Sequence, residues 1–362
     1  MLKYLSLINK TLNNISQEII INPDRCLKFL SKYDTCGRCE NICPNCAINI
    51  NKKTNKITVN HNLCTYCGLC VSFCPLTVFE FKYIGYIDLF ELTEEYYNKY
   101  KKIIFICEKF IHQKNLIKTT NGINIPCIGI LDYSLLIHMF LLKPENITIY
   151  SDCSNCKNKA AFDFSFILNK EINSFLSLFN FNNIQINCKN KFDDDTVKNI
   201  IANKCSITNE QTLTRREVFN YYKNHFVTTT KKSFHIIKEE STDVITKNNH
   251  KKKFIPLHRL LFLKDLKNII NAVNKPLKID NFSFLKTINI DFTKCNMCSI
   301  CYIFCPTGAL IENSEKDENG ILRKKGINII QEKCINCDFC VNICPKNAIN
   351  YVNSFTLNDY IA

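Results

Sequence analysis

The chain has 362 residues, of which 23 are cysteine, and its formal net charge is +14. This length allows two or three domains, each with a core of its own. It excludes the small secreted scaffolds that use many cysteines as disulfides, because these have fewer than about 100 residues. The N-terminal stretch is too polar for a signal peptide. We therefore expect a cytoplasmic protein whose thiols stay reduced.

The first 22 residues are predicted to form a helical leader that becomes extended at 18–21. Residues 23–86 contain the pattern C-x2-C-x2-C-x3-C-P from Cys64 to Pro75, and a shorter copy, CGRCENICP, that begins at Cys36. Cysteines at this spacing are typical ligands of [4Fe–4S] clusters. Alternating apolar residues at 55–61 and 77–83 predict short strands beside the motifs. We predict that residues 23–86 form a unit with two clusters.

Residues 98–190 differ in character. Buried strands are predicted for four apolar segments, at 103–107, 123–127, 147–153 and 184–188, and helices for the segments at 133–142 and 159–179. Strands that alternate with helices predict a parallel sheet with right-handed crossovers. The most apolar run, 130–142, is too short to span a membrane and includes Asp132 and His138. We expect it to be a buried helix, and we expect no membrane span.

Four cysteines of this domain follow its predicted strands. Cys107, Cys127 and Cys153 each end a strand, and Cys156 completes a C-x2-C pair with Cys153. The carboxyl ends of parallel strands share one edge of the sheet, so these four thiols could converge there. Three interpretations stay open: a further metal or [2Fe–2S] site, a redox-active dithiol at Cys153 and Cys156, or inert buried thiols.

Residues 191–285 are predicted to form a helical and basic linker region. Helices are predicted at 194–226 and 258–273, and lysines gather in the polar run 228–259. Four oxidised clusters would subtract about 8 from the formal charge, which makes the chain only modestly basic. We therefore favour a solvated linker or a docking face for an acidic redox partner over nucleic-acid binding.

Residues 286–354 contain two complete motifs, which begin at Cys295 and Cys334, after a predicted strand at 286–292. In two-cluster proteins the fourth cysteine of one motif binds the neighbouring cluster. This rule pairs the motifs and predicts three complete ligand sets: Cys295, Cys298 and Cys301 with Cys344; Cys334, Cys337 and Cys340 with Cys305; and Cys64, Cys67 and Cys70 with Cys43.

The remaining set consists of Cys36, Cys39 and Cys74 and lacks one thiolate. Cys26 lies ten residues before Cys36, far enough for the chain to return it to the cluster. Cys46 lies three residues after Cys43, where the chain usually leads away from the cluster. We favour Cys26 over Cys46. A three-iron cluster without a fourth ligand is the remaining alternative.

Both ends of the chain, about 130 residues on the quoted motifs, resemble bacterial ferredoxins with two [4Fe–4S] clusters. The segment RCLKFLSKYDTCGRCENICPNCAI at 25–48 is similar to the opening of bacterial polyferredoxins, a resemblance that implies Cys26 as a ligand. The inserted segment, in which IPCIG and a helix precede SDCSNC, weakly resembles the small iron–sulfur subunit of methanogen-type hydrogenases. That family implies a two-iron cluster, but this chain has only one cysteine after its first strand.

These expectations combine into an α+β fold in which two dicluster ferredoxin-like units flank an inserted α/β domain with a parallel sheet. The chain has no G-x-G-x-x-G sequence and no P-loop. We predict a multi-cluster electron-transfer protein, a subunit or carrier for a larger oxidoreductase complex, and assign no catalytic residue. The alternative is an enzyme, or a sulfur- or disulfide-handling protein, whose Cys107, Cys127, Cys153 and Cys156 receive electrons from the clusters.

Overall fold

The computed structural model describes residues 18–31, 34, 36–82, 84–113, 122–153, 156–180, 185–191, 253–273, 277–316 and 322–360. These residues belong to one compact unit that combines 1–192 with 253–362. The predicted leader at 1–17, the predicted helix at 194–226 and the basic run up to residue 252 lie outside the described residues.

The N-terminal motif unit, residues 18–82, consists of two short antiparallel strand pairs. Strand β1 (Ile19–Ile21) pairs with β4 (Phe79–Phe81), and β2 (Ile48–Asn51) pairs with β3 (Lys56–Val59). The connections contain the 3-10 helix η2 (Pro23–Arg25) and the helices α2 (Leu27–Leu30), α3 (Arg38–Ile42) and α4 (Leu69–Phe73). The predicted extended residues at 18–21 are thus confirmed as an outer strand.

The C-terminal motif unit, residues 277–360, repeats this pattern. Its outer pair is β10 (Ile288–Ile290) with β13 (Ile349–Tyr351), and its inner pair is β11 (Leu310–Lys316) with β12 (Leu322–Ile329). Helices α12 (Ile300–Ile303) and α13 (Phe339–Ile343) begin within the motifs, and η5 (Gln331–Lys333) precedes Cys334. Two additional strands, β9 (Lys278–Asp280) and β14 (Ser354–Thr356), pair outside this repeat, and η6 (Asn358–Tyr360) follows them.

The inserted domain contains a four-stranded, all-parallel sheet. Its strands lie in the order β6 (Ile123–Ile125), β5 (Ile103–Cys107), β7 (Ile147–Tyr150) and β8 (Ile186–Lys189). Every residue of the first three strands is buried, as expected for a parallel sheet covered on both faces. The prediction of a parallel sheet from alternating strands and helices is therefore confirmed.

Helices cover this sheet. They are α5 (Tyr86–Tyr100), α6 (Glu108–Gln113), α7 (Tyr133–Leu141) and α8 (Lys159–Ser177), and the 3-10 helix η3 (Ile128–Ile130) precedes α7. A further helix, α11 (Leu257–Val273), packs on α7. The predicted buried helix is α7, whose N-cap residue Asp132 accepts a hydrogen bond from the backbone N–H of Leu135 at 2.9 Å. Within the described residues, no helix is both long enough and apolar enough to cross a membrane.

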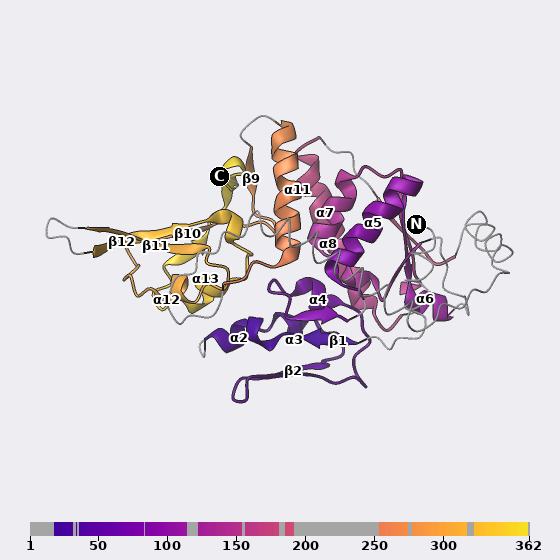
Figure 1. The fold of residues 1–362 in the computed structure, drawn as a ribbon, viewed down its shortest axis with the longest axis horizontal. Coiled ribbons are helices and arrows are strands. Elements are labelled where there is room, and N and C mark those ends of the chain that lie inside the picture. The colour runs from indigo at the N-terminus through magenta and orange to yellow at the C-terminus, as the bar shows by residue number, and fades with distance from the viewer. Residues whose placement is uncertain are drawn as a thin grey trace, which may run out of the picture. The chain divides into compact units, whose positions relative to one another are not determined.

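Helix α11 comes from the region predicted as a linker, yet it packs against α7 (Figure 1). Ser134 donates a hydrogen bond to the carbonyl of His258 at 2.9 Å, and His138 Nδ1 lies 3.0 Å from a carboxylate oxygen of Asp265. Phe262 of α11 is fully buried. The apolar face of α11 thus completes the core of the inserted domain.

Aromatic rings connect the inserted domain with the start of the C-terminal motif unit. Tyr133 of α7 stacks on Phe284 with ring centroids 5.5 Å apart, and Phe175 of α8 meets Phe282 and Phe284 edge-on at 5.2 and 5.5 Å. Phe262 of α11 makes a further edge contact with Phe284 at 6.0 Å. Such contacts add to the burial of large apolar surfaces, so this aromatic cluster joins the two regions into one core.

Candidate iron–sulfur centres and the neighbouring thiols

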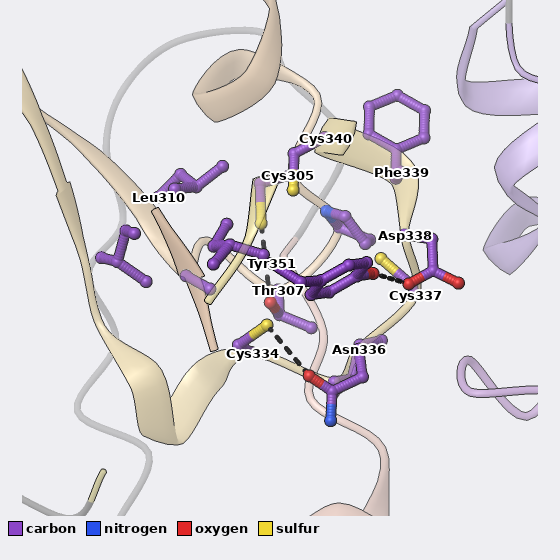
Figure 2. Close-up of a pocket in the computed structure, with 15 residues that line it drawn as sticks. Cys305, Thr307, Leu310, Cys334, Asn336, Cys337, Asp338, Phe339, Cys340 and Tyr351 are labelled. Atoms are coloured by element: carbon purple, nitrogen blue, oxygen red, sulfur yellow. Dashed lines mark hydrogen bonds between the residues drawn. The ribbon is translucent and has the colours of Figure 1, made fainter. Parts of the chain in front are cut away.

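In the C-terminal motif unit, one cavity gathers the predicted set of Cys305, Cys334, Cys337 and Cys340. Figure 2 shows these four side chains around the cavity, with Leu310, Phe339 and Tyr351 among the other residues that line it. The four thiols come from two motifs, as the pairing rule requires. A second cavity is lined by the other predicted set, which consists of Cys295, Cys298, Cys301 and Cys344.

The two cavities are neighbours. The thiol of Cys340, in the first set, lies close enough to Cys301, in the second, for their charges to repel, and burial together with this crowding raises the pKa of Cys340. Cys298 is exposed, while Cys301 and Cys305 are buried. The second cavity therefore has a ligand position at the molecular surface, and the first lies deeper.

In the N-terminal motif unit, thiols gather in the predicted combinations. Burial, followed by the proximity of Cys43 among others, raises the pKa of the Cys64 thiol and, to about 11, that of Cys67. The second group contains Cys26: burial, followed by the nearby thiols of Cys74, Cys26 and Cys36, raises the pKa of Cys39 to about 12.

This crowding indicates what kind of group fits. Buried thiols resist ionisation because the charged form loses hydration and the thiolates repel one another. Iron ions would offset both costs, and binding of metal to such a site releases the thiol protons. Each group of four therefore suits a [4Fe–4S] cluster, which would supply reversible one-electron transfer, better than it suits four free thiols.

The backbone around each complete motif supports the same chemistry. In all three motifs the residues on either side of the second cysteine adopt left-handed conformations, which is uncommon outside glycine; they are Tyr66, Gly68, Met297, Ser299, Asn336 and Asp338. When right-handed and left-handed backbone conformations alternate, successive N–H groups point toward one side and form an anion-binding nest. The N–H groups of Tyr66 and Asn336 donate to the sulfurs of Cys64 and Cys334.

Cys26 occupies the position of a first motif cysteine. It caps η2 with φ −72° and ψ 127°, as Cys334 caps η5 with φ −73° and ψ 124°. In all four motifs the first cysteine lies five positions after the last residue of a strand, which is Ile21 before Cys26, Val59 before Cys64, Ile290 before Cys295 and Ile329 before Cys334. Cys26 therefore has the backbone setting of a first motif cysteine, with α2 and its flanks between it and Cys36.

Cys46 occupies a turn instead. It is exposed, its φ is +48°, and its N–H donates to the carbonyl of Cys43 at 3.2 Å. The same left-handed turn occurs three positions after the fourth cysteine of each complete motif. The residues there are Thr77, Gly308 and Asn347, none of which can be a thiolate ligand. The geometry of Cys46 is thus that of a turn residue that leads away from the cluster.

An arginine connects the two motif units. Arg38 lies between Cys36 and Cys39, and its guanidinium donates to the carbonyl of Asn336 at 2.9 Å and pairs with the carboxylate of Asp338. Asn336 and Asp338 flank Cys337 in the motif of the opposite unit. This ionic contact therefore lies between the set that contains Cys36 and the set that contains Cys337, which we call the inner sets.

Lys253 holds part of the C-terminal motif through hydrogen bonds to its backbone, a role that the sequence analysis did not predict. Its ammonium group donates to the carbonyls of Ile303 and Cys305, each at 2.7 Å. The sequence assigned this residue to a solvated basic run. Here its cation lies beside the backbone of a predicted ligand, where it offsets negative charge.

The thiols at the edge of the parallel sheet form a pair and two neighbours. The Cys107 thiol donates to the carbonyl of Pro126 at 3.7 Å and lies beside the sulfur of Cys127. The interaction between the two sulfurs raises the pKa of Cys107, and together with the donors of Gly129 and Asn158 it lowers the pKa of Cys127. Cys153 lies near both Cys127 and Cys156.

Among the residues that the structure describes, no three His, Cys, Asp or Glu side chains gather closely enough to bind a metal ion. The C-terminal motif cysteines surround cavities and suit a group larger than one ion. The predicted additional metal or [2Fe–2S] site therefore receives no support.

The pair of thiols lies directly behind the N-terminal motif. The segment η3 follows Cys127 and packs against the motif: a Cβ atom added at Gly129 would stand 2.4 Å from the carbonyl oxygen of Cys67. Ser72 donates to the carbonyl of Gly129 at 2.8 Å. Gly68, at φ +81°, also lies close to this segment, because a Cβ atom added there would stand 3.0 Å from the backbone nitrogen of Ile130. The absence of side chains at two glycines thus brings the sheet edge against the motif.

Replacement of Gly129 by alanine is expected to loosen this contact. The new methyl group would overlap the Cys67 carbonyl and meet Ala161 at 3.0 Å, an overpacking cost of about 1–3 kcal/mol. Anaerobic heating, followed by the visible absorbance of the clusters, should show earlier bleaching. The matched control is Gly326→Ala, whose methyl would meet Phe292 at an ordinary 3.6 Å. Equal bleaching temperatures for both variants would contradict the tight contact.

Comparison with known families agrees with the two motif units. Residues 34–78 match one model of a 4Fe–4S dicluster domain, and residues 287–345 match another. No curated protein matches the chain. The matches support a ferredoxin-type, iron–sulfur electron-transfer role for both ends. They do not reach the inserted domain, and its resemblance to a hydrogenase subunit receives no support from them.

Proposed function

We propose that this chain is an electron-transfer protein with four [4Fe–4S] clusters and that it serves a larger oxidoreductase complex as a subunit or carrier. The sixteen ligands would be the four sets described above, with Cys26 completing the set of Cys36, Cys39 and Cys74. The arrangement of these sets as neighbours is the observation that carries the proposal.

Electrons would move through the sets in series. The set with Cys298 has a ligand at the surface, where a protein partner can approach it. The set with Cys340 is next to it, and the Arg38 contact leads from there to the set with Cys36. The set with Cys64 follows, interlocked through Cys43. A series of neighbouring one-electron centres is suited to conduction between a donor and an acceptor.

The chain's own residues would tune and protect these centres. The nest N–H groups donate to ligand sulfurs, and such hydrogen bonds stabilise the added negative charge of a reduced cluster. Phe339 is almost fully buried beside its set and excludes water. Arg38 and Lys253 place positive charge near ligands of the inner sets.

Metal analysis of the anaerobically prepared chain tests the proposal. We expect about sixteen irons per chain and EPR signals of reduced, interacting [4Fe–4S] clusters after dithionite treatment. About eighteen irons would indicate an added two-iron cluster in the inserted domain. A colourless preparation without EPR signals after reduction would refute the proposed function.

A further inference from the structure

The proposed electron-transfer role leaves the buried thiols Cys107 and Cys127 without a task. Cys107 ends β5, and Cys127 follows β6, which is the neighbouring parallel strand. Both side chains are buried, with exposed fractions of 5% and 2%. Both are free thiols, and the Cys107 thiol donates to the carbonyl of Pro126, the residue directly before Cys127, at 3.7 Å. Two neighbouring thiols on adjacent strands are the starting geometry for a reversible disulfide.

Asn158 is a buried polar residue that donates hydrogen bonds to two sulfurs of this site. It is 1% exposed, and its Nδ2 donates to the sulfur of Cys127 at 3.6 Å, while its backbone N–H donates to the sulfur of Cys156 at 3.4 Å. Its Oδ1 has no hydrogen-bond partner among the described residues. A buried amide with an unused acceptor is costly in a site made only for packing. The unused acceptor can receive a proton-bearing group, such as a newly formed thiol.

The pair also lies beside a predicted cluster. Cys127 is close enough to Cys67 for their charges to interact, and the backbone of Gly129 contacts that of Cys67. The positive charge of Lys109 in α6 acts on both Cys64 and Cys127. Electrons that arrive at the set of Cys43, Cys64, Cys67 and Cys70 would therefore have these sulfurs as their next neighbours.

We propose that Cys107 and Cys127 form a redox-active dithiol that exchanges two electrons with this cluster, an inference that rests on the proposed function. In the oxidised form the two sulfurs share a disulfide bond. Two successive one-electron transfers from the reduced cluster, with uptake of two protons, break that bond and yield two thiols. Oxidation returns both electrons to the cluster, releases both protons and forms the bond again. The site converts one-electron transfer into a two-electron step.

An anaerobic electron titration of the full chain tests this inference. The wild-type chain is expected to take up two electrons per molecule more than the Cys107→Ser variant, while the EPR signals of the clusters stay equal. Serine keeps a donor for the Pro126 carbonyl, so the variant retains that contact. The matched control is Cys188→Ser, at the exposed Cys188 of β8, and it should take up as many electrons as the wild type.

Equal electron uptake by wild type and Cys107→Ser, with cluster signals intact in both, would overturn the dithiol and leave the proposed function standing. Missing cluster signals in the wild type would overturn both. A second measurement avoids any variant: the wild-type chain is oxidised with ferricyanide, its free thiols are alkylated, and its peptides are mapped by mass spectrometry. Peptides joined through Cys107 and Cys127 support the inference, and alkylated forms of both cysteines overturn it.

Discussion

Replacement of Cys26 by serine is expected to change one of the four centres and to leave the other three intact. Cys26 is buried, and its thiol crowds against those of Cys74 and Cys36. Without it, this centre keeps three thiolates and should lose at least one iron or the whole cluster. Iron should fall from about sixteen per chain to between about twelve and fifteen. A three-iron cluster would appear as a new EPR signal in the oxidised chain.

The matched variant is Cys46→Ser. Cys46 lies only three residues after Cys43, but it is exposed in a left-handed turn. We expect its substitution to leave both iron content and EPR signals unchanged. If Cys46→Ser lost iron and Cys26→Ser did not, the ligand assignment of the first centre would have to be reversed, although the other three sets would be unaffected.

The difference between these cysteines could have been read more firmly from the sequence. The spacing from strand to first cysteine is the same in all four motifs, but it becomes visible only when β1 is recognised as the equivalent of β3, β10 and β12. Local patterns predicted 18–21 as extended without relating it to Cys26. The inserted helix α2 interrupts the spacing of the cysteines themselves, which is the signal that motif comparison uses.

The parallel sheet was predictable because its strands are continuous apolar runs between helical segments. Helix α11 was predicted as a helix, but its role in the core was not, since sequence alone does not say which distant element covers an apolar face. Helix α5 and the long hairpin of β11 and β12 were not assigned. The 15-residue α5 buries Leu89, Phe90, Thr93 and Tyr96 at helical spacing, so its pattern was present in the sequence and was missed.

The thiols of the inserted domain show how far the position of a residue at the carboxyl end of a parallel strand predicts its neighbours. The rule that parallel strands bring their carboxyl ends together correctly placed Cys107 near Cys127 and Cys153 near Cys127. The sequence suggested the C-x2-C pair as the dithiol. The structure also brings Cys107 beside Cys127, because β5 and β6 are neighbours in the sheet.

Arg259 of α11 gives the second large effect, because it is a fully buried cation. Its guanidinium donates to the hydroxyl of Tyr360, while Nε and Nη1 have no hydrogen-bond partner among the described residues. Burial opposes its charged form, but the oxygens of Tyr360 and Tyr133 and the sulfur of Cys334 together raise its pKa. Buried charges are normally compensated, and the ion pairs of the described residues include none for Arg259. The negative cluster at Cys334 would supply that compensation.

Arg259→Met is therefore expected to make this cluster harder to reduce. A positive charge near a reducible centre stabilises the added electron by on the order of 1–2 kcal/mol in partly buried surroundings, which corresponds to roughly 40–90 mV for a one-electron couple. EPR-monitored redox titration should show one cluster at a lower potential, with the clusters of the N-terminal unit as internal references. Arg259→Lys, which keeps the positive charge, should leave the potential of this cluster close to that of the wild type. Unchanged potentials in Arg259→Met would show that the buried guanidinium serves packing against Phe262 and Tyr360 alone.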